Sequence, residues 1–204
     1  MTSIYLASKS PRRKELLSQM GVDFDVLAIN DHTLGAFDGD EVQHEGEAPQ
    51  DYVVRTAQDK ARAVLKLIQD KNLPPRPVLS ADTTVIVNGK ILGKPEDKTQ
   101  AMQFLHQMSN TVHEVRTAVV LAIDEQHLYT LVSVSKVWFS QLTQEQIHAY
   151  ADSDEPYDKA GGYGIQGSAA AFIHRIEGSY SGIMGLPVFE TARLLEKIGY
   201  RFPN

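Results

Sequence analysis

The sequence contains no cysteine, and this absence removes several kinds of chemistry. Without thiols the chain can form no disulfide, no thiolate nucleophile and no zinc–sulfur site, and it suits a reducing compartment. Long apolar runs are missing too, since no stretch approaches the roughly 18 apolar residues of a membrane span. The amino end also lacks the basic-then-apolar pattern of a secretory signal. We therefore expect a soluble cytoplasmic protein with no membrane partner.

A strongly basic stripe is a further missing feature. The 204 residues carry a formal net charge of −6 at pH 7, and no long run of Lys and Arg exists to displace counterions from a nucleic-acid backbone. Nucleic acid is therefore not expected as a partner, whereas one locally basic pocket suffices for a small phosphorylated ligand. The length and the 42% hydrophobic content predict a single domain over 1–204 with a sizeable core.

The stretch from Leu6 to Leu17 predicts a strand, a tight loop and a helix. Ser10 suits the N-cap of that helix, and Pro11 suits its first position. The loop combines backbone N–H groups, two hydroxyls and the positive end of a helix with Arg12 and Arg13 on the first turn. This combination favours a polyanion site, although an ordinary capped helix with solvated arginines has the same pattern.

Two charged residues interrupt apolar patterns. A helix is predicted over 49–71, and Lys60 falls inside its apolar stripe. The lysine either lies along apolar neighbours with its amine in water or points its charge into a cleft. The residues 78–87 predict two strand segments that meet at Asp82. A buried charge is costly unless it is paired or metal-bound, so Asp82 is a candidate for chemistry. The alternative is an aspartate that ends one strand and caps a turn.

The remaining patterns predict ordinary α/β elements. These are a strand over 22–29, an acidic mobile loop over 33–48, a hairpin turn at Asn88-Gly89, a helix capped by Asp97, a β-hairpin over 115–139, a helix opened by a capping box at Thr143, a strand over 169–173, a flexible loop over 178–185 and a last helix from Pro187.

Common nucleotide and metal motifs are absent or misplaced. The residues 162–167 match G-x-G-x-x-G, but that motif requires a strand before it and a helix opening at it, whereas here a polar loop precedes and a predicted strand follows. No Walker-type G-x-x-x-x-G-K-[ST] and no H-E-x-x-H occurs. The seven histidines show no ligand spacing and are expected at the surface. A dinucleotide fold, a P-loop ATPase and a zinc peptidase are therefore not expected.

Motifs spread over nearly the whole chain resemble those of the Maf family of nucleoside triphosphate pyrophosphatases. They occur in the family's order, at 6–17 (LASKSPRRKELL), 81–83 (ADT), 93–95 (GKP), 153–156 (SDEP), 158–161 (DKAG), 163–167 (YGIQG) and 185–187 (GLP). The resemblance implies an α/β fold of the Maf/ITPase type, with a mixed, curved central sheet flanked by helices and a deep cleft between two lobes.

The resemblance also implies a reaction. It is hydrolysis between the α- and β-phosphates of a nucleoside triphosphate, with a divalent metal, Mg²⁺ or Mn²⁺, and a role in nucleotide-pool sanitation. The Ile165-Gln166 pair resembles the branch that acts on dTTP and UTP, and modified pyrimidine triphosphates are further candidates. A homodimer is implied as well. Two alternatives stay open: a nucleotide-binding regulator of septum formation with little catalysis, and a pyrophosphatase for modified guanine nucleotides.

Roles for individual residues follow from the resemblance and from charge chemistry. The catalytic set is Asp82 as general base with Lys60, Lys94 and Arg13. The substrate-binding set is Ser8, Ser10, Arg12, Thr83, Gln166 and Lys159, of which Arg12, Thr83 and Gln166 are implied to select the base. The metal set is Asp31, Asp82 and Glu155, with Asp154 as a further candidate. Asp31 stands where the family usually has a glutamate.

Overall fold

The computed structural model describes residues 3–27 and 42–202, and these divide into two compact units. Unit 1 comprises Met1–Asp82, Thr117–Ser133 and Gly185–Asn204, and unit 2 comprises Thr83–Arg116 and Val134–Met184. Three strands contribute residues to both units: β3 (Val78–Val87), β5 (Val112–Ala122) and β6 (Leu128–Phe139). The single domain expected over 1–204 stays a prediction.

The strands form one mixed sheet, which confirms the predicted α/β class. Its order is β2-β1-β3-β5-β6-β7, and β4 pairs with β3 outside this path. Strand β1 (Ile4–Leu6) is parallel to both β2 (Phe24–Val26) and β3. Strand β4 (Lys90–Leu92) is antiparallel to β3, and β7 (Ile173–Glu177) is antiparallel to β6.

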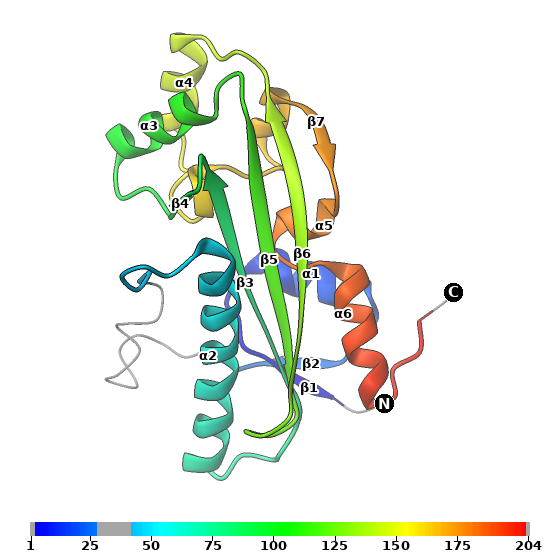
Figure 1. Cartoon of the computed structure of the whole chain (residues 1–204). Coiled ribbons are helices and arrows are strands. Elements are labelled where there is room, and N and C mark those ends of the chain that lie inside the picture. Colours follow the sequence, from blue (N-terminus) through cyan, green and yellow to red (C-terminus); the bar gives the residue numbers. More distant parts are fainter. Residues whose placement is uncertain (1–2, 28–41, 203–204) are drawn as a thin grey trace. The chain divides into compact units, whose positions relative to one another are not determined.

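Helices cover both faces of the strands in unit 1 (Figure 1). The long helix α2 (Pro49–Asp70) buries its apolar stripe against residues of β1, β3 and β5. Helices α1 (Pro11–Gln19) and α6 (Val188–Leu195) lie on the other side of these strands, and η3 (Glu196–Ile198) extends α6. All three residues of β1 are buried, as expected of a strand covered on both faces.

Unit 2 has its own core, built around aromatic rings. Helices α3 (Lys98–Met108) and α4 (Gln144–Ala151) contribute to it, with residues of β3 to β6 and of the short 3₁₀ helices η1 (Ala160–Gly162) and η2 (Ser168–Phe172). The Phe139 and Tyr163 rings meet edge to face at 5.0 Å, and Phe172 contacts both Phe139 and Tyr150. Tyr163 belongs to the glycine-rich segment that follows α4, so this segment contributes directly to the core.

Several elements predicted from short-range patterns are confirmed. Asn88 and Gly89 both have positive φ, as the tight turn between β3 and β4 requires. Asp97 accepts a hydrogen bond from the Gln100 backbone at 2.8 Å and so caps α3. Thr143 forms the expected capping box at the start of α4. These signals succeed because their partners lie only a few residues apart.

Other predictions were wrong where tertiary packing decides the conformation. The residues 78–87 form one continuous strand, with Asp82 in its middle and no break. The strand expected over 169–173 is the 3₁₀ helix η2, and β7 begins only at Ile173. The loop expected over 178–185 contains helix α5 (Tyr180–Met184). Most of the acidic loop expected over 33–48 lies outside the described residues.

His113 corrects the expectation of surface histidines. It lies on β5 in the core of unit 2, only 3% exposed, and its Nε2 is 2.7 Å from the Tyr163 hydroxyl. Its Nδ1 has no hydrogen-bond partner within the described part of the chain. Protonation would therefore bury an N–H without an acceptor, and burial lowers the pKa of His113 from 6.5 to about 4.

We expect this histidine to make folding pH-dependent. Below the pKa of the unfolded chain, only the unfolded state takes up the proton, so stability falls as the pH drops from about 6.5 to about 4. The full loss is about 3 kcal/mol. Urea unfolding at several pH values measures it, and His113→Gln, which cannot titrate, should lose most of this slope. An unchanged slope would contradict the assignment.

No helix in the described ranges combines the length and the hydrophobicity needed to cross a membrane.

Candidate active site

The loop before α1 is organised by Ser8 and Arg13 in unit 1. Ser8 is buried, and its Oγ accepts hydrogen bonds from the Ser10 backbone N–H at 3.2 Å and from Arg13 Nη1 at 3.3 Å. Arg13 Nε donates to the carbonyl of Gly185 at 2.7 Å, just ahead of α6. The guanidinium is therefore held from two sides beside the N-terminus of a nine-residue helix. This arrangement suits phosphate oxygens.

Ser10 departs from its expected local role. It occupies the N-cap position, but its side chain makes no capping hydrogen bond. Ser8 instead receives the loop's backbone N–H, so the hydroxyl expected to cap the helix is not used for that purpose. The predicted role of Ser10 and Arg12 in substrate binding stays a prediction.

Lys60 and Asp82 form an ion pair within unit 1. Lys60 Nζ lies 2.6 Å from Asp82 Oδ1, and the side chains are 19% and 11% exposed. A direct hydrogen bond aligns α2 with β3, because Ser80 Oγ on β3 donates to the carbonyl of Ala57 on α2 at 2.7 Å. Ala57 and Ala61 are fully buried, so their small side chains let the helix approach the strand closely. Lys60 thus points to a carboxylate instead of lying along apolar neighbours.

The Lys60–Asp82 pair also decides between the readings of Asp82. A carboxylate in the middle of a ten-residue strand neither ends that strand nor caps a turn. Burying two charges is costly, and a hydrogen-bonded pair offsets most of that cost. Residues that carry a buried charge at the expense of stability are candidates for chemistry.

Unit 2 carries the other predicted residues. Thr83 is half-buried on β3, and Lys94 is exposed after β4. The Gly161 N–H donates to the carbonyl of Gly93 at 2.9 Å, which ties the loop bearing Lys94 to η1. Gln166 is exposed in a turn between η1 and η2.

Glu155 and Lys159 are engaged within their own segment. Glu155 Oε1 accepts from the Tyr150 hydroxyl at 2.9 Å, and Oε2 accepts from both the backbone N–H and the hydroxyl of Ser168 at 3.0 and 2.7 Å. Lys159 Nζ donates to the Glu155 carbonyl and to Asp158. Although burial would raise it, the pKa of Glu155 is lowered because Ser168 and Tyr150 hydrogen-bond its charged form.

The predicted metal ligands within the described ranges are the carboxylates of Asp82, Asp154 and Glu155. Within the described ranges, no group of three or more His, Asp or Glu side chains is placed to hold an ion. Asp31 lies outside those ranges, so its predicted ligation stays a prediction. Both oxygens of Glu155 accept hydrogen bonds from the protein, and its predicted ligation stays a prediction. Ligation by Asp82 and by the exposed Asp154 stays a prediction as well.

The sequence missed the partners that position these groups. Gly185 was noted only as part of a motif, yet its carbonyl orients Arg13. Tyr150 and Ser168 hold Glu155, but nothing in their local sequence marks them. Motif positions indicate which residues matter, whereas backbone carbonyls and distant hydroxyls become visible only once the chain is folded.

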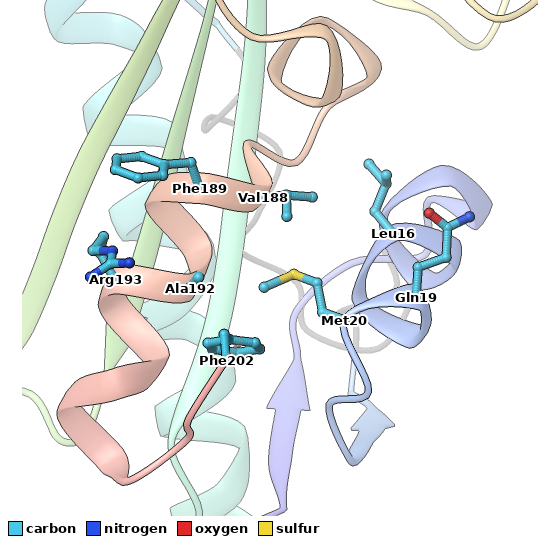
Figure 2. A pocket seen from close by; sticks show the side chains of 8 residues that line it. All are labelled: Leu16, Gln19, Met20, Val188, Phe189, Ala192, Arg193 and Phe202. Carbon is cyan, nitrogen blue, oxygen red and sulfur yellow. The ribbon is translucent and has the colours of Figure 1, made fainter. Parts of the chain in front are cut away.

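A hollow elsewhere in unit 1 has a different chemistry (Figure 2). It lies between α1 and α6 and is lined by Leu16, Gln19, Met20, Val188, Phe189, Ala192, Arg193 and Phe202. Most of these side chains are apolar, and Arg193 is paired with Glu196. A triphosphate is therefore not expected there.

Comparisons with known proteins match the whole chain. A dTTP/UTP pyrophosphatase of Bordetella avium (strain 197N) is 52% identical over 200 residues, which cover 98% of this chain and 97% of that protein. A dTTP/UTP pyrophosphatase of Aromatoleum aromaticum is 50% identical over 198 residues, covering 97% and 96% of the two chains.

A more distant similarity is found among solved structures. A HAM1 protein from Coxiella burnetii superposes with a TM-score of 0.45 at 15% identity, covering 71% of this chain and 76% of that chain.

The family model described as "Maf-like protein" matches residues 3–198. This match and the two relatives agree with the motifs and with the mixed α/β fold, so the chain belongs to the Maf-like protein family.

Proposed function

We propose that this protein is a nucleoside triphosphate pyrophosphatase that hydrolyses dTTP and UTP to the monophosphate and pyrophosphate. The Lys60–Asp82 ion pair carries the proposal, because it supplies a carboxylate whose position is fixed by a neighbouring ammonium. The two relatives, each about half identical over almost the full length, are named for this activity. The proposed biological role is sanitation of the nucleotide pool, with modified pyrimidine triphosphates as further substrates.

In the proposed reaction, a water molecule attacks the α-phosphorus of the nucleotide, and Asp82 accepts a proton from that water. The new P–O bond forms as the bond to the pyrophosphate oxygen breaks, so pyrophosphate leaves with the electron pair of that bond. Lys60 is proposed to orient the carboxylate before the attack, through its 2.6 Å contact with Asp82 Oδ1. Arg13, Ser8 and the N-terminus of α1 are proposed to bind phosphate oxygens, and Lys94 to neutralise charge on the leaving group.

A divalent cation is part of the proposal, with Asp82 as its proposed ligand among the described residues. Such an ion would supply charge neutralisation and activation of water. Two further proposals rest on the family resemblance: a homodimer and a cytoplasmic location. Size-exclusion chromatography with light scattering tests the first, and fractionation of cells tests the second.

The function is tested by a panel of nucleoside triphosphates. Pyrophosphate release is measured from all canonical and several modified triphosphates with Mg²⁺, with Mn²⁺ and with chelator. Metal-dependent release that is fastest from dTTP and UTP supports the proposal. Nucleotide binding without release from any triphosphate would overturn it in favour of a regulator, and a preference for modified guanine nucleotides would overturn the substrate assignment.

Base selection is proposed to depend on Gln166, with Arg12 and Thr83. A glutamine amide offers one donor and one acceptor, which match the O4 and N3–H groups of uracil and thymine. We expect Gln166→Glu, which removes the donor, to lower kcat/KM for dTTP and UTP by about 10- to 100-fold. Gln107→Glu on the exposed side of α3 is the matched control. An unchanged profile across nucleotides would remove Gln166 from base selection.

A further inference from the structure

Gln166 lies at the tip of a turn that is closed by a backbone hydrogen bond. The Gly167 N–H donates to the carbonyl of Gly164 at 3.1 Å, so Ile165 and Gln166 are the two central residues. Ile165 is only 6% exposed and anchors the turn in the core of unit 2, whereas Gln166 faces solvent. How Gly164 and Gly167 are held therefore sets the point from which the Gln166 side chain leaves the backbone.

Glu155 packs directly against the second glycine of this turn. A Cβ on Gly167 would lie 2.1 Å from Glu155 Oε1, which is far inside contact distance, so the carboxylate in its present position occupies the space that a side chain there would need. The same carboxylate binds the N–H and hydroxyl of Ser168 and the hydroxyl of Tyr150. Glu155 thus connects helix α4 to the residue that follows the turn.

Lys159 packs against the first glycine in the same way. A Cβ on Gly164 would lie 2.9 Å from Lys159 Cε, so the stem of the lysine fills the space beside the glycine. Its Nζ donates to the Glu155 carbonyl at 2.6 Å and to Asp158 Oδ1 at 2.5 Å, and the side chain is only 14% exposed. The ammonium therefore hydrogen-bonds within the loop over 155–159, which lies next to the turn.

We propose that Glu155 and Lys159 are positioning residues that fix the turn carrying Gln166, and so determine base selectivity, instead of binding metal and substrate directly. This inference rests on the base-selecting role proposed for Gln166. Each of the two side chains occupies the space beside one glycine of the turn, and each is committed to hydrogen bonds inside unit 2. Loss of either should loosen the turn without removing a group that touches phosphate or metal.

The first test separates positioning from metal binding. The ratio of kcat/KM for dTTP to that for dCTP, and the Mg²⁺ concentration for half-maximal activity, are measured for Glu155→Ala, Gln166→Ala and their combination. We expect Glu155→Ala to lower the ratio about tenfold, the double variant to lose no more than Gln166→Ala, and the Mg²⁺ requirement to stay within twofold. A tenfold higher Mg²⁺ requirement with an unchanged ratio would overturn the proposal.

The conservative variant Glu155→Gln and the surface control Glu125→Gln complete this test. Glutamine at position 155 keeps the side-chain volume and one acceptor, so Glu155→Gln should recover part of the dTTP/dCTP ratio. Glu125 is exposed between β5 and β6, and Glu125→Gln should leave the ratio unchanged. An equal loss of kcat/KM for every substrate by both Glu155 variants would mean a merely structural role. A wild-type ratio near one would contradict the proposed function itself, before any variant is compared.

A second test starts from the glycine that packs against the carboxylate. Gly167→Ala should clash with Glu155 and lower the ratio, whereas adding Glu155→Ala vacates that space. The fall in Tm of the double variant should therefore be smaller than the sum of the two single falls. Additive falls would overturn the packing argument, and the dTTP/dCTP ratio of Gly167→Ala alone serves as the test if Glu155→Ala folds poorly.

Lys159→Met tests the other side of the turn. Methionine keeps much of the apolar stem beside Gly164 but removes the ammonium. We expect a changed dTTP/dCTP ratio with little change in KM for dTTP, while the exposed Lys90→Met is the matched control. An equal rise in KM for all triphosphates, with the ratio unchanged, would instead assign Lys159 to phosphate binding and overturn its positioning role.

Discussion

Replacing Asp82 by asparagine is expected to slow pyrophosphate release from dTTP by about 10³-fold, the effect of removing a general base. Asparagine matches aspartate in shape, so the strand β3 and the Ser80–Ala57 hydrogen bond should stay intact. The amide cannot accept the proton of the attacking water at neutral pH. Steady-state pyrophosphate release measures the loss, and the circular dichroism spectrum checks that the fold is kept.

Asp59→Asn is the matched control for this substitution. Asp59 is the neighbour of Lys60 on α2, but its carboxylate pairs with Arg55 and Arg62 on the same helix. We expect its activity to stay within about twofold of wild type, since ion pairs between residues one turn apart on the same helix contribute little to stability. Activity of Asp82→Asn close to that of Asp59→Asn would exclude Asp82 as the base.

The largest expected effect on stability is that of Gly161→Ala. Gly161 is buried in η1 with φ +71°, and a Cβ there would lie 2.8–2.9 Å from three side-chain atoms of Val85. A non-glycine residue is strained at this φ, and the added methyl overpacks the core of unit 2. Together these effects should lower the free energy of unfolding by about 3 kcal/mol or more.

Gly93→Ala provides the comparison within the same pair of loops. Its carbonyl accepts the hydrogen bond from Gly161, but a Cβ at Gly93 meets nothing within 4 Å. Urea unfolding of both variants should show a large loss for Gly161→Ala and a change of at most about 0.5 kcal/mol for Gly93→Ala. Equal losses of unfolding free energy in the two variants would mean that the Val85 side chain moves aside and that the clash does not destabilise the protein.

The contrast between η2 and α4 explains how far sequence patterns reach. Thr143 and Gln146 each accept a hydrogen bond from the other's backbone N–H, so four consecutive residues suffice to predict the start of α4. The residues 168–172 have an apolar composition that suits a strand, yet they form a 3₁₀ helix whose first N–H is held by Glu155, thirteen residues earlier. Short apolar runs do not distinguish these outcomes.

His113 illustrates the same limit for a single side chain. Histidine is polar enough to be expected at the surface, and its sequence neighbours do not indicate otherwise. Its burial follows from the packing of Phe139 and Tyr163, which lie 26 and 50 residues further along the chain. The pH dependence expected of this protein is therefore invisible before folding.

The sequence by itself determined the family and the α/β class, and it predicted the residues on which the proposed chemistry depends. These follow from local composition and from motifs whose meaning survives without coordinates. Only the tertiary structure decided that Lys60 faces Asp82, that Gly185 holds Arg13, and that Glu155 and Lys159 pack against the two glycines beside Gln166. The reason is physical: these contacts join segments far apart in the chain, and their geometry depends on the packing of the intervening elements.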